Sequence, residues 1–242
     1  MTIQFYGKLG WPFLPVLGVI IATAAIAGGF AGFLSRRLRL QPLIVTLAVG
    51  SCVAGAILAS IGMYVNGLPP AWLQEAASPS GTTLGVPLPP VILLWAALMV
   101  GVNVFLHLTP GGRRLYATGS NPRAAETAGV HTQRVWMAAF AASAVFAALA
   151  GVLIAGFSGA SDASLGDSYL WAGLTAVIVG GTAFGARGDY WRTVLGCLFL
   201  TELSTVLVGR GLSTADQQIV NGLLILVVVG FYARERRLGD RI

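Results

Sequence analysis

The stretch VWMAAFAASAVFAALAGVLIAGF, residues 135 to 157, carries no charged side chain and is long enough to cross a lipid bilayer. A bilayer core of about 30 Å takes roughly 20 apolar residues of helix. A helix also satisfies its own backbone hydrogen bonds, which the interior of a membrane requires. The stretch therefore predicts a transmembrane helix. Strands of a β-barrel would alternate in hydrophobicity over about 10 residues, and this stretch does not.

Similar apolar runs lie on both sides of this stretch. With it they predict an all-α, polytopic membrane protein of about seven segments, and we expect one transmembrane domain over residues 1–242. The composition agrees, since 56% hydrophobic and 10% charged residues leave too few polar side chains to cover a soluble protein of this length. One run is short and ends in glycines, so it either spans the membrane or forms a re-entrant helix. The six further runs are 11 to 34, 42 to 61, 89 to 108, 170 to 184 (the short one), 193 to 209 and 217 to 232.

The basic residues predict the orientation of the chain in the plasma membrane. Of the 15 Lys and Arg, all but Lys8 and Arg210 fall on one predicted side. Positively charged loops stay in the cytoplasm, so the C-terminus is predicted to be cytoplasmic and the N-terminus external. The residues on the predicted cytoplasmic side are Arg36, Arg37, Arg39, Arg113, Arg114, Arg123, Arg134, Arg187, Arg192, Arg234, Arg236, Arg237 and Arg241.

Several kinds of chemistry have no sequence support. The chain contains no G-x-x-x-x-G-K-[ST] phosphate loop, so any ATP hydrolysis must come from a partner. His107 and His131 are isolated, and Cys52 and Cys197 lie inside apolar runs, so we expect no metal site and no disulfide. The basic residues sit between apolar runs and not along an aqueous face, which argues against nucleic-acid binding. We expect no enzyme active site and no cofactor bound by this chain.

Small residues at a spacing of four predict where helices pack closely. One such stripe is expected in the first apolar run and one in the run 135 to 157. The stripes are Ala24, Gly28 and Gly32, and Ala139, Ser143, Ala147, Gly151 and Ala155.

The long polar loop from Thr109 to Arg134 is predicted to contain a short helix with a start signal and a stop signal. Asn121 is a good N-cap, Pro122 suits the first helical position, and Gly129 can adopt the left-handed conformation that ends a helix. The predicted helix has about seven residues and carries Arg123 and Glu126. A compact polar helix in the cytoplasm suits docking into a groove of another protein, although a plain solvated surface helix would show the same pattern.

The loop sequence GGRRLYATGSNPRAAETAGV resembles the cytoplasmic loop of the ribose-type sugar permeases of ABC importers. A second stretch, AVIVGGTAFGARGDYWRTVLGCLFL, is similar to the glycine-rich segment of the same family, and QPLIVTLAVG and YVNGLPP also fit. The resemblance runs from about residue 30 to 232. The matching positions are Gly112, Arg113, Tyr116, Gly119, Asn121, Ala124, Ala125 and Gly129 in the loop, and Gly180, Gly181, Thr182, Gly188 and Gly196 in the glycine-rich segment.

This resemblance implies a permease that pairs with a second permease subunit, identical or closely related, around a central pathway. Cytoplasmic ATP-binding subunits, which hold the ATP and Mg, would grip the helix at 121 to 129. An extracytoplasmic binding protein would deliver the sugar. The residues implied in coupling to the ATPase are Gly112, Arg113, Tyr116, Asn121, Arg123, Ala124, Ala125, Glu126 and Gly129.

The sequence departs from the family pattern in three places. The family usually has further membrane segments ahead of the region that matches residue 1, so we expect this chain to be truncated. Ser204 and Thr205 stand where the family tends to have asparagines, and Phe184 and Arg187 interrupt the glycine-rich segment. The identity of the sugar therefore does not follow from the sequence.

Polar residues inside the apolar runs are candidates for the substrate pathway. Glu202 lies midway along the run 193 to 209, and an ionisable group at that depth is costly. It could bind sugar hydroxyls together with Thr201, Ser204 and Thr205, or it could pair with another helix. Asn103 is a weaker candidate, since a hydrogen bond between helices would also explain it.

Three other functions stay open from the sequence. A branched-chain amino acid permease shares the architecture, although its loop usually carries more acidic residues. A secondary transporter or channel would need several embedded, paired charges, and only Glu202 is embedded. The third is a membrane scaffold that transports nothing.

Overall fold

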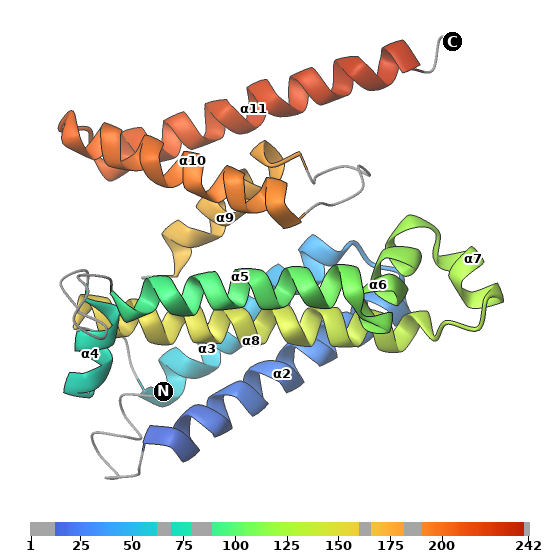
Figure 1. Cartoon of the computed structure of the whole chain (residues 1–242), viewed down its shortest axis with the longest axis horizontal. Helices are drawn as coiled ribbons and strands as arrows, with labels where there is room; N and C mark the ends of the chain where they lie inside the picture. The colour runs from blue at the N-terminus through green and yellow to red at the C-terminus, as the bar shows by residue number, and fades with distance from the viewer. Residues whose placement is uncertain (1–12, 62–68, 79–88, 160–165, 182–189, 240–242) are drawn as a thin grey trace. The chain divides into compact units, whose positions relative to one another are not determined.

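Helices form all the regular structure among the residues that the computed structural model describes, which are 13–61, 69–78, 89–159, 166–181 and 190–239 (Figure 1). The prediction of an all-α protein is confirmed. The chain divides into two compact units, Met1–Ala163 and Ser164–Ile242, each with its own internal packing. The single domain over residues 1–242 stays a prediction.

Within its described residues the first unit holds two long helices, two of intermediate length and three short ones. The sequence predicts the long helices from their apolar runs and the helix at 121 to 129 from its caps. The described helices are α2 (Phe13–Leu38), α3 (Pro42–Ile61), α4 (Ala71–Ala77), α5 (Pro90–Leu108), α6 (Pro110–Ser120), α7 (Pro122–Thr127) and α8 (Thr132–Ser158).

The second unit holds three described helices. The described part of the predicted run 170 to 184 falls on the first of them, which ends at Val179, just before the Gly180–Gly181 pair. The helices are α9 (Asp167–Val179), α10 (Tyr190–Gly209) and α11 (Thr214–Gly239).

Five of the described helices are long and apolar enough to cross a membrane by length and composition: α2, α3, α5, α8 and α10. Two shorter apolar helices, Tyr169–Val179 within α9 and Ala215–Gly230 within α11, match the remaining predicted runs. Helix α5 is apolar except for Asn103 and His107, yet none of its residues is buried in the protein. A helix that is mostly apolar and not covered by protein is typical of a membrane span.

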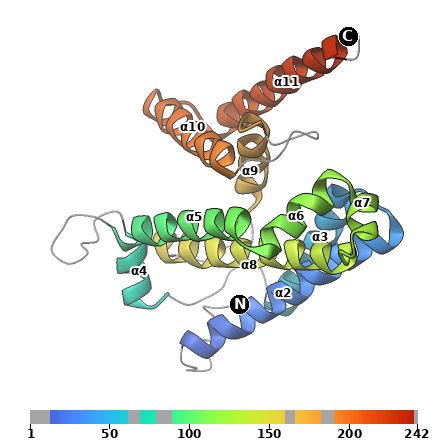
Figure 2. The same ribbon diagram turned by 45° about the vertical axis from the view of Figure 1, so that its right-hand side comes forward.

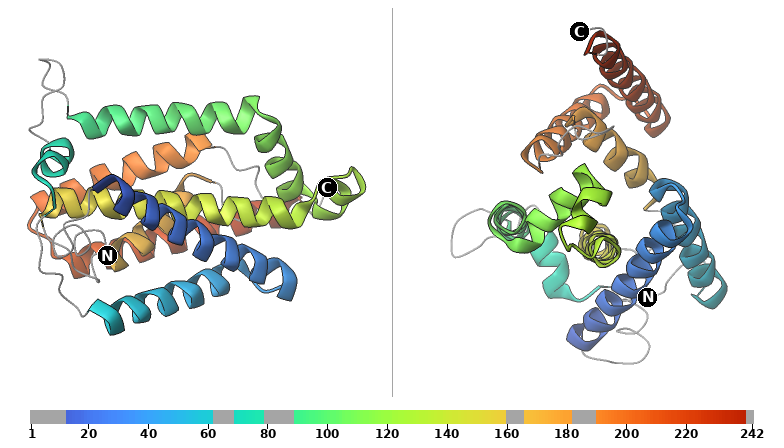
Figure 3. Two further views of the ribbon diagram at one scale, coloured as in Figure 1. Left: turned by 90° about the horizontal axis from the view of Figure 1, so that it is seen from below. Right: turned by 90° about the vertical axis from the view of Figure 1, so that its right-hand side faces the viewer.

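The main contact of the first unit joins α2 to α8, and two glycines of α2 permit it (Figure 3). A Cβ added at Gly28 would lie 2.5 Å from the carbonyl oxygen of Phe140, and one added at Gly32 would lie 3.0 Å from the Cα of Met137. As residue numbers rise along α2 they fall along α8, so the two helices run antiparallel. The predicted stripe on α2 is therefore confirmed at Gly28 and Gly32.

The predicted stripe on α8 is not the part of that helix nearest the α2 glycines, and its own packing partner stays a prediction. The residues of α8 that meet the α2 glycines are Trp136, Met137, Phe140, Ala141 and Ala144, not the series that begins at Ala139. Gly151, which belongs to the predicted series, has no atom within 4 Å of where a Cβ would be. The reason is that only one partner needs small residues at a close helix contact, and α2 supplies them.

Helix α4 packs against one end of the α2–α8 pair, opposite the end that holds α7 (Figure 2). Leu73 of α4 is buried, and its Cγ would lie 2.9 Å from a Cβ added at Gly156 of α8. The rings of Phe13 and Trp72 meet edge to face with centroids 4.8 Å apart. This end of the unit is thus held by apolar and aromatic packing.

In the second unit α9 crosses α10 through a pair of glycines. A Cβ at Gly180 would lie 2.6 Å from the carbonyl oxygen of Arg192, and one at Gly196 would lie 2.4 Å from that of Ala176. Gly181 then ends α9 with φ at 73°, a left-handed conformation that favours glycine. Gly180 and Gly196 of the family-like segment therefore have a packing role.

Candidate functional site

A sharp corner joins α5 to α6 in the first unit. The Thr109 hydroxyl donates to the carbonyl oxygen of Phe105 at 2.6 Å and accepts from the backbone N–H of Gly112 at 3.2 Å, which caps α6. A Cβ at Gly112 would lie only 2.2 Å from the carbonyl oxygen of Leu106, so no other residue fits there without a shift of the backbone. Gly112, which the resemblance assigns to ATPase coupling, thus has a structural role in the turn.

Helix α7 has the caps that the sequence predicts. The side-chain oxygen of Asn121 accepts hydrogen bonds from the backbone N–H groups of Arg123 and Ala124, both at 3.1 Å. Gly129 lies just beyond the helix with φ at 81°. The helix itself, Pro122–Thr127, is one residue shorter than predicted. Both ends of α7 are therefore satisfied by local contacts.

The side chains of α7 divide into an inward and an outward set. Ala125 is 4% exposed and packs against its own chain. Arg123, Ala124, Thr127 and Ala128 are exposed. The outward face of α7 is thus formed by these four residues, and α7 lies at an extremity of the first unit (Figure 1).

Glu126 of α7 turns back toward its own unit. Its Oε1 accepts from the guanidinium of Arg36, at the C-terminal end of α2, in an ion pair. The hydroxyl of Thr132, the first residue of α8, donates to the same oxygen at 2.5 Å, and Nη2 of Arg36 lies 3.1 Å from that hydroxyl. We call these three residues the Arg36–Glu126–Thr132 cluster. It joins three helices, α2, α7 and α8, at one point.

The cluster affects the titration of Glu126. The hydrogen bond from the Thr132 hydroxyl, followed by that from Arg36, lowers the pKa of the Glu126 carboxyl below its ordinary value of 4.5. The carboxyl is therefore ionised at neutral pH and can keep both partners. Thr132 is 3% exposed, while the side chains of Arg36 and Glu126 are 30% and 49% exposed.

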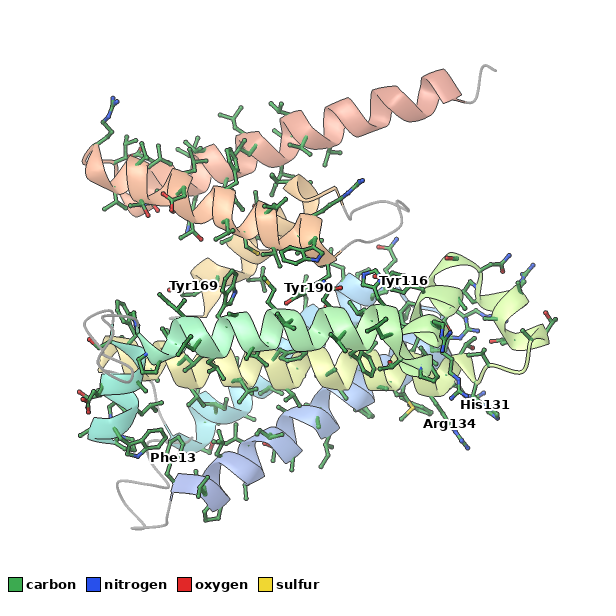
Figure 4. All side chains as sticks on the ribbon, viewed as in Figure 1. Phe13, Tyr116, His131, Arg134, Tyr169 and Tyr190 are labelled. Carbon is green, nitrogen blue, oxygen red and sulfur yellow. The ribbon has the colours of Figure 1, made fainter. Side chains whose placement is uncertain are left out.

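The arginines of the first unit gather at the end that holds this cluster. Arg36 contacts α7 directly, and Figure 4 labels Arg134 near the start of α8, beside His131. The opposite end, at α4, carries the acidic Glu75 and no arginine among the described residues. A one-sided distribution of arginine is what the positive-inside rule describes. The arginines at the α7 end are Arg36, Arg37, Arg39, Arg113, Arg114, Arg123 and Arg134.

Three further family-matched residues lie on α6. Tyr116 is half-buried, and its ring centroid lies 6.0 Å from that of His107 on α5 (Figure 4). Arg113 is exposed. Gly119 has open space where a Cβ would be, so the fold of this chain does not require glycine there.

The predicted pathway residues lie in different units. Thr201, Glu202 and Thr205 are exposed on α10, whereas the hydroxyl of Ser204 donates to Oε1 of Gln217 on α11 at 3.0 Å. Glu202 is two residues from the buried Leu200, about 200° round the helix at roughly 100° per residue, so it faces away from the packed side of α10.

The structure describes only some of the remaining predicted site residues. Asn103 is half-buried on α5, in the other unit from α10. Thr182 and Gly188 lie outside the described residues. Gly180 and Gly181 are placed at the end of α9, as given above. Whether any of these residues touches a substrate stays a prediction.

The sequence interpretation missed three residues at the α7 end: Arg36, Thr109 and Thr132. Arg36 was counted for topology only, and its partner is 90 residues away in the chain. One signal was present, because Glu126 is the single acidic residue between Pro89 and Gly159 and lies on the side where all the arginines of that region fall. A lone carboxylate among arginines is expected to pair, but which arginine it chooses depends on how α2 packs on α8.

A bundle of lipid-length helices with a short capped helix at an arginine-rich end is typical of a membrane transport subunit. The family described as "branched-chain amino acid transport system / permease component" matches residues 1–229. The chain therefore belongs to this permease family and is a multi-pass membrane protein. It is a transport component and not an enzyme.

Several similar proteins are named as sugar import permeases. The ribose import permease protein RbsC of Bacillus subtilis is 32% identical over 222 residues, which cover 89% of this chain and 67% of that protein. RbsC of Haemophilus influenzae is 28% identical over 90% of this chain and 68% of its own length. The galactose/methyl galactoside import permease protein MglC of Treponema pallidum is 29% identical over 94% of this chain and 45% of its own length. The chain thus spans between about half and two thirds of these relatives. No solved structure matches it.

Proposed function

We propose that this chain is a membrane-spanning permease subunit of an ATP-driven ABC importer that translocates a small, ribose-like sugar across the plasma membrane. The functions in the names of similar proteins, which include ribose, galactose and autoinducer-2 import, support this class of substrate. ATP and Mg would be held by partner ATP-binding subunits. A second permease subunit would complete the pathway, and an extracytoplasmic protein would deliver the sugar.

The observation that carries the proposal is the outward face of α7. The backbone groups at both ends of this helix are satisfied by the neighbouring residues Asn121 and Gly129. It lies among arginines, at the end that the positive-inside rule assigns to the cytoplasm. A short capped helix with two small exposed side chains, Ala124 within it and Ala128 at its end, suits insertion into a groove of an ATP-binding subunit.

Substitution of Ala124 tests this docking. Ala124→Glu keeps α7 intact, because glutamate three residues after the Asn121 cap favours a helix start. We expect the variant to insert into the membrane normally and to lose co-purification with the ATP-binding subunit by about tenfold or more, as for a central interface residue. Ala125 is the wrong position for this test, because it is buried in its own chain.

Ala71→Glu, at the first position of α4 on the opposite end, is the matched control. It adds the same charge at an exposed alanine near the start of a short helix, and it should co-purify like the parent. If Ala124→Glu co-purified as well as the control, α7 would not be the docking helix. If the parent itself failed to co-purify, a secondary transporter, a channel or a scaffold would be favoured.

As substrate-pathway residues we propose Thr201, Glu202, Ser204 and Thr205 of α10, and separately Asn103 of α5. Glu202 is exposed on the side of α10 away from its packing contacts, and a carboxylate facing lipid would be costly. It therefore needs an aqueous pathway or another helix beside it. Glu202→Gln should change the sugar concentration for half-maximal uptake if it lines the pathway, and leave that concentration unchanged if it only pairs with a helix.

A branched-chain amino acid is the second candidate substrate, because the matching family is described by that transport system. Uptake of labelled pentoses, hexoses and branched-chain amino acids by the complete assembly separates the two. We expect saturable, ATP-dependent uptake of a monosaccharide. Uptake of leucine, isoleucine or valine with no uptake of any sugar would favour the second candidate.

A further inference from the structure

Helix α7 is too short to be stable by itself, so it cannot transmit a movement unless other contacts hold it. It has six residues, and isolated helices of that length are not stable in water. Its caps fix its shape but not its position. Its position relative to the membrane helices depends on a few contacts: the burial of Ala125, its junctions with α6 and α8, and the Arg36–Glu126–Thr132 cluster.

The cluster is the point where α7 meets the most extensive helix pair of its unit. Arg36 ends α2, and Thr132 begins α8. These two helices pack closely along their length through Gly28 and Gly32, with backbone atoms of α8 about as near as glycine allows. A displacement of Glu126 is therefore applied to both helices of a closely packed pair at once.

The cluster is poorly placed to serve stability alone. The side chains of Arg36 and Glu126 are 30% and 49% exposed, and exposed ion pairs contribute little to folding. Its geometry suits the orientation of α7 better than the stabilisation of the fold, because one carboxylate oxygen accepts hydrogen bonds from two different helices. With two donors on separate helices, Glu126 restricts rotation of α7 as well as its distance from them.

We infer that Glu126 is a positioning residue that makes α7, α2 and α8 move as one rigid body, with Arg36 and Thr132 as the two points that it holds. The inference rests on the proposed function, in which the outward face of α7 docks on an ATP-binding subunit. Movement of that subunit would reach the membrane helices through the cluster. Docking and transmission are then separate: Ala124 serves the first and Glu126 the second.

The test uses the complete assembly in proteoliposomes and measures the amount of sugar imported per ATP hydrolysed. Glu126→Gln keeps the size of the side chain and removes its charge. We expect co-purification with the ATP-binding subunit to stay near the parent level, while import per ATP falls about fivefold or more, at the low end of allosteric coupling. Glu75→Gln on the opposite end is the matched control and should leave import per ATP unchanged.

A double-mutant cycle then asks whether Arg36 and Glu126 act through each other. If they do, Arg36→Gln/Glu126→Gln should lower import per ATP no further than either single variant. Losses that multiply in the double variant would overturn the inference. Arg37→Gln, one residue along α2 and exposed, controls for the general loss of a positive charge.

A distance measurement provides a readout besides activity. Spin labels on Thr127→Cys of α7 and Ala138→Cys of α8, after Cys52 and Cys197 are replaced by alanine, should report one narrow distance in the parent. Glu126→Gln should broaden it, and Arg37→Gln should not.

The outcomes separate the two proposals. An unchanged distance and unchanged import per ATP in Glu126→Gln would overturn the positioning role and leave the docking proposal standing. Loss of co-purification in Glu126→Gln would show a docking contact instead and would also overturn it. If the parent neither binds an ATP-binding subunit nor couples ATP to import, the proposed function itself fails.

Discussion

The two ends of the first unit are held together by different chemistry. At the α4 end, Leu73 packs on Gly156 and Phe13 on Trp72, so the contacts are apolar and aromatic. At the α7 end, the cluster of Arg36, Glu126 and Thr132 is polar and partly exposed. The described arginines of the unit all lie at this end. The difference indicates that one end is closed by packing, while the other keeps a polar helix available to a partner.

The largest effect is expected from a substitution in the α5–α6 turn, which should destabilise the α7 end of the unit. Gly112→Ala places a Cβ 2.2 Å from a backbone oxygen, which cannot move without distorting the α5–α6 turn. We expect a loss of about 3 kcal/mol, the upper part of the usual range for overpacking. Gly156→Ala is the control at the α4 end: its nearest neighbour is the Leu73 side chain at 2.9 Å, and we expect about 1 kcal/mol.

Thermal unfolding in detergent measures both variants. The midpoint of Gly112→Ala should lie well below that of Gly156→Ala. Equal midpoints would mean that the corner is no more constrained than the apolar end.

A smaller effect is expected from the cap of α7. Asn121→Ala removes the acceptor for two backbone N–H groups, and loss of such a cap costs about 1 kcal/mol. Because α7 is short, most of this should appear as local fraying. Faster amide hydrogen exchange at Arg123 and Ala124, with unchanged exchange in α4, would support the account. Unchanged exchange at both amides would show that the cap does not maintain α7.

The smallest expected effect is on pH dependence. Since the folded pKa of Glu126 lies below 4.5, its contacts contribute fully above that ordinary value and are lost as the pH falls through the lowered pKa. A spin label on Thr127→Cys should therefore become more mobile only under acid conditions. Glu126→Gln should remove this transition. A parent transition centred above pH 4.5 would contradict the assigned cause.

The comparison of the two ends also shows what the sequence could predict. The apolar runs predicted the membrane helices, and the caps of α7 followed from Asn121 and Gly129, because both signals are local. The Arg36–Glu126 contact did not follow, since several arginines were equally available and the choice depends on helix packing. The face of α8 that meets α2 did not follow from the sequence either, because a stripe of small residues shows where close packing is possible and not which helix it contacts.

The central claim is that the arginine-rich end, with the outward face of α7, lies in the cytoplasm. Thr127→Cys is exposed on that face and can be labelled with a membrane-impermeant maleimide, after Cys52 and Cys197 are replaced by alanine. In cells without the ATP-binding subunit, the account predicts no labelling while the cells are intact and full labelling once the membrane is opened. Labelling in intact cells would place α7 outside and contradict the account.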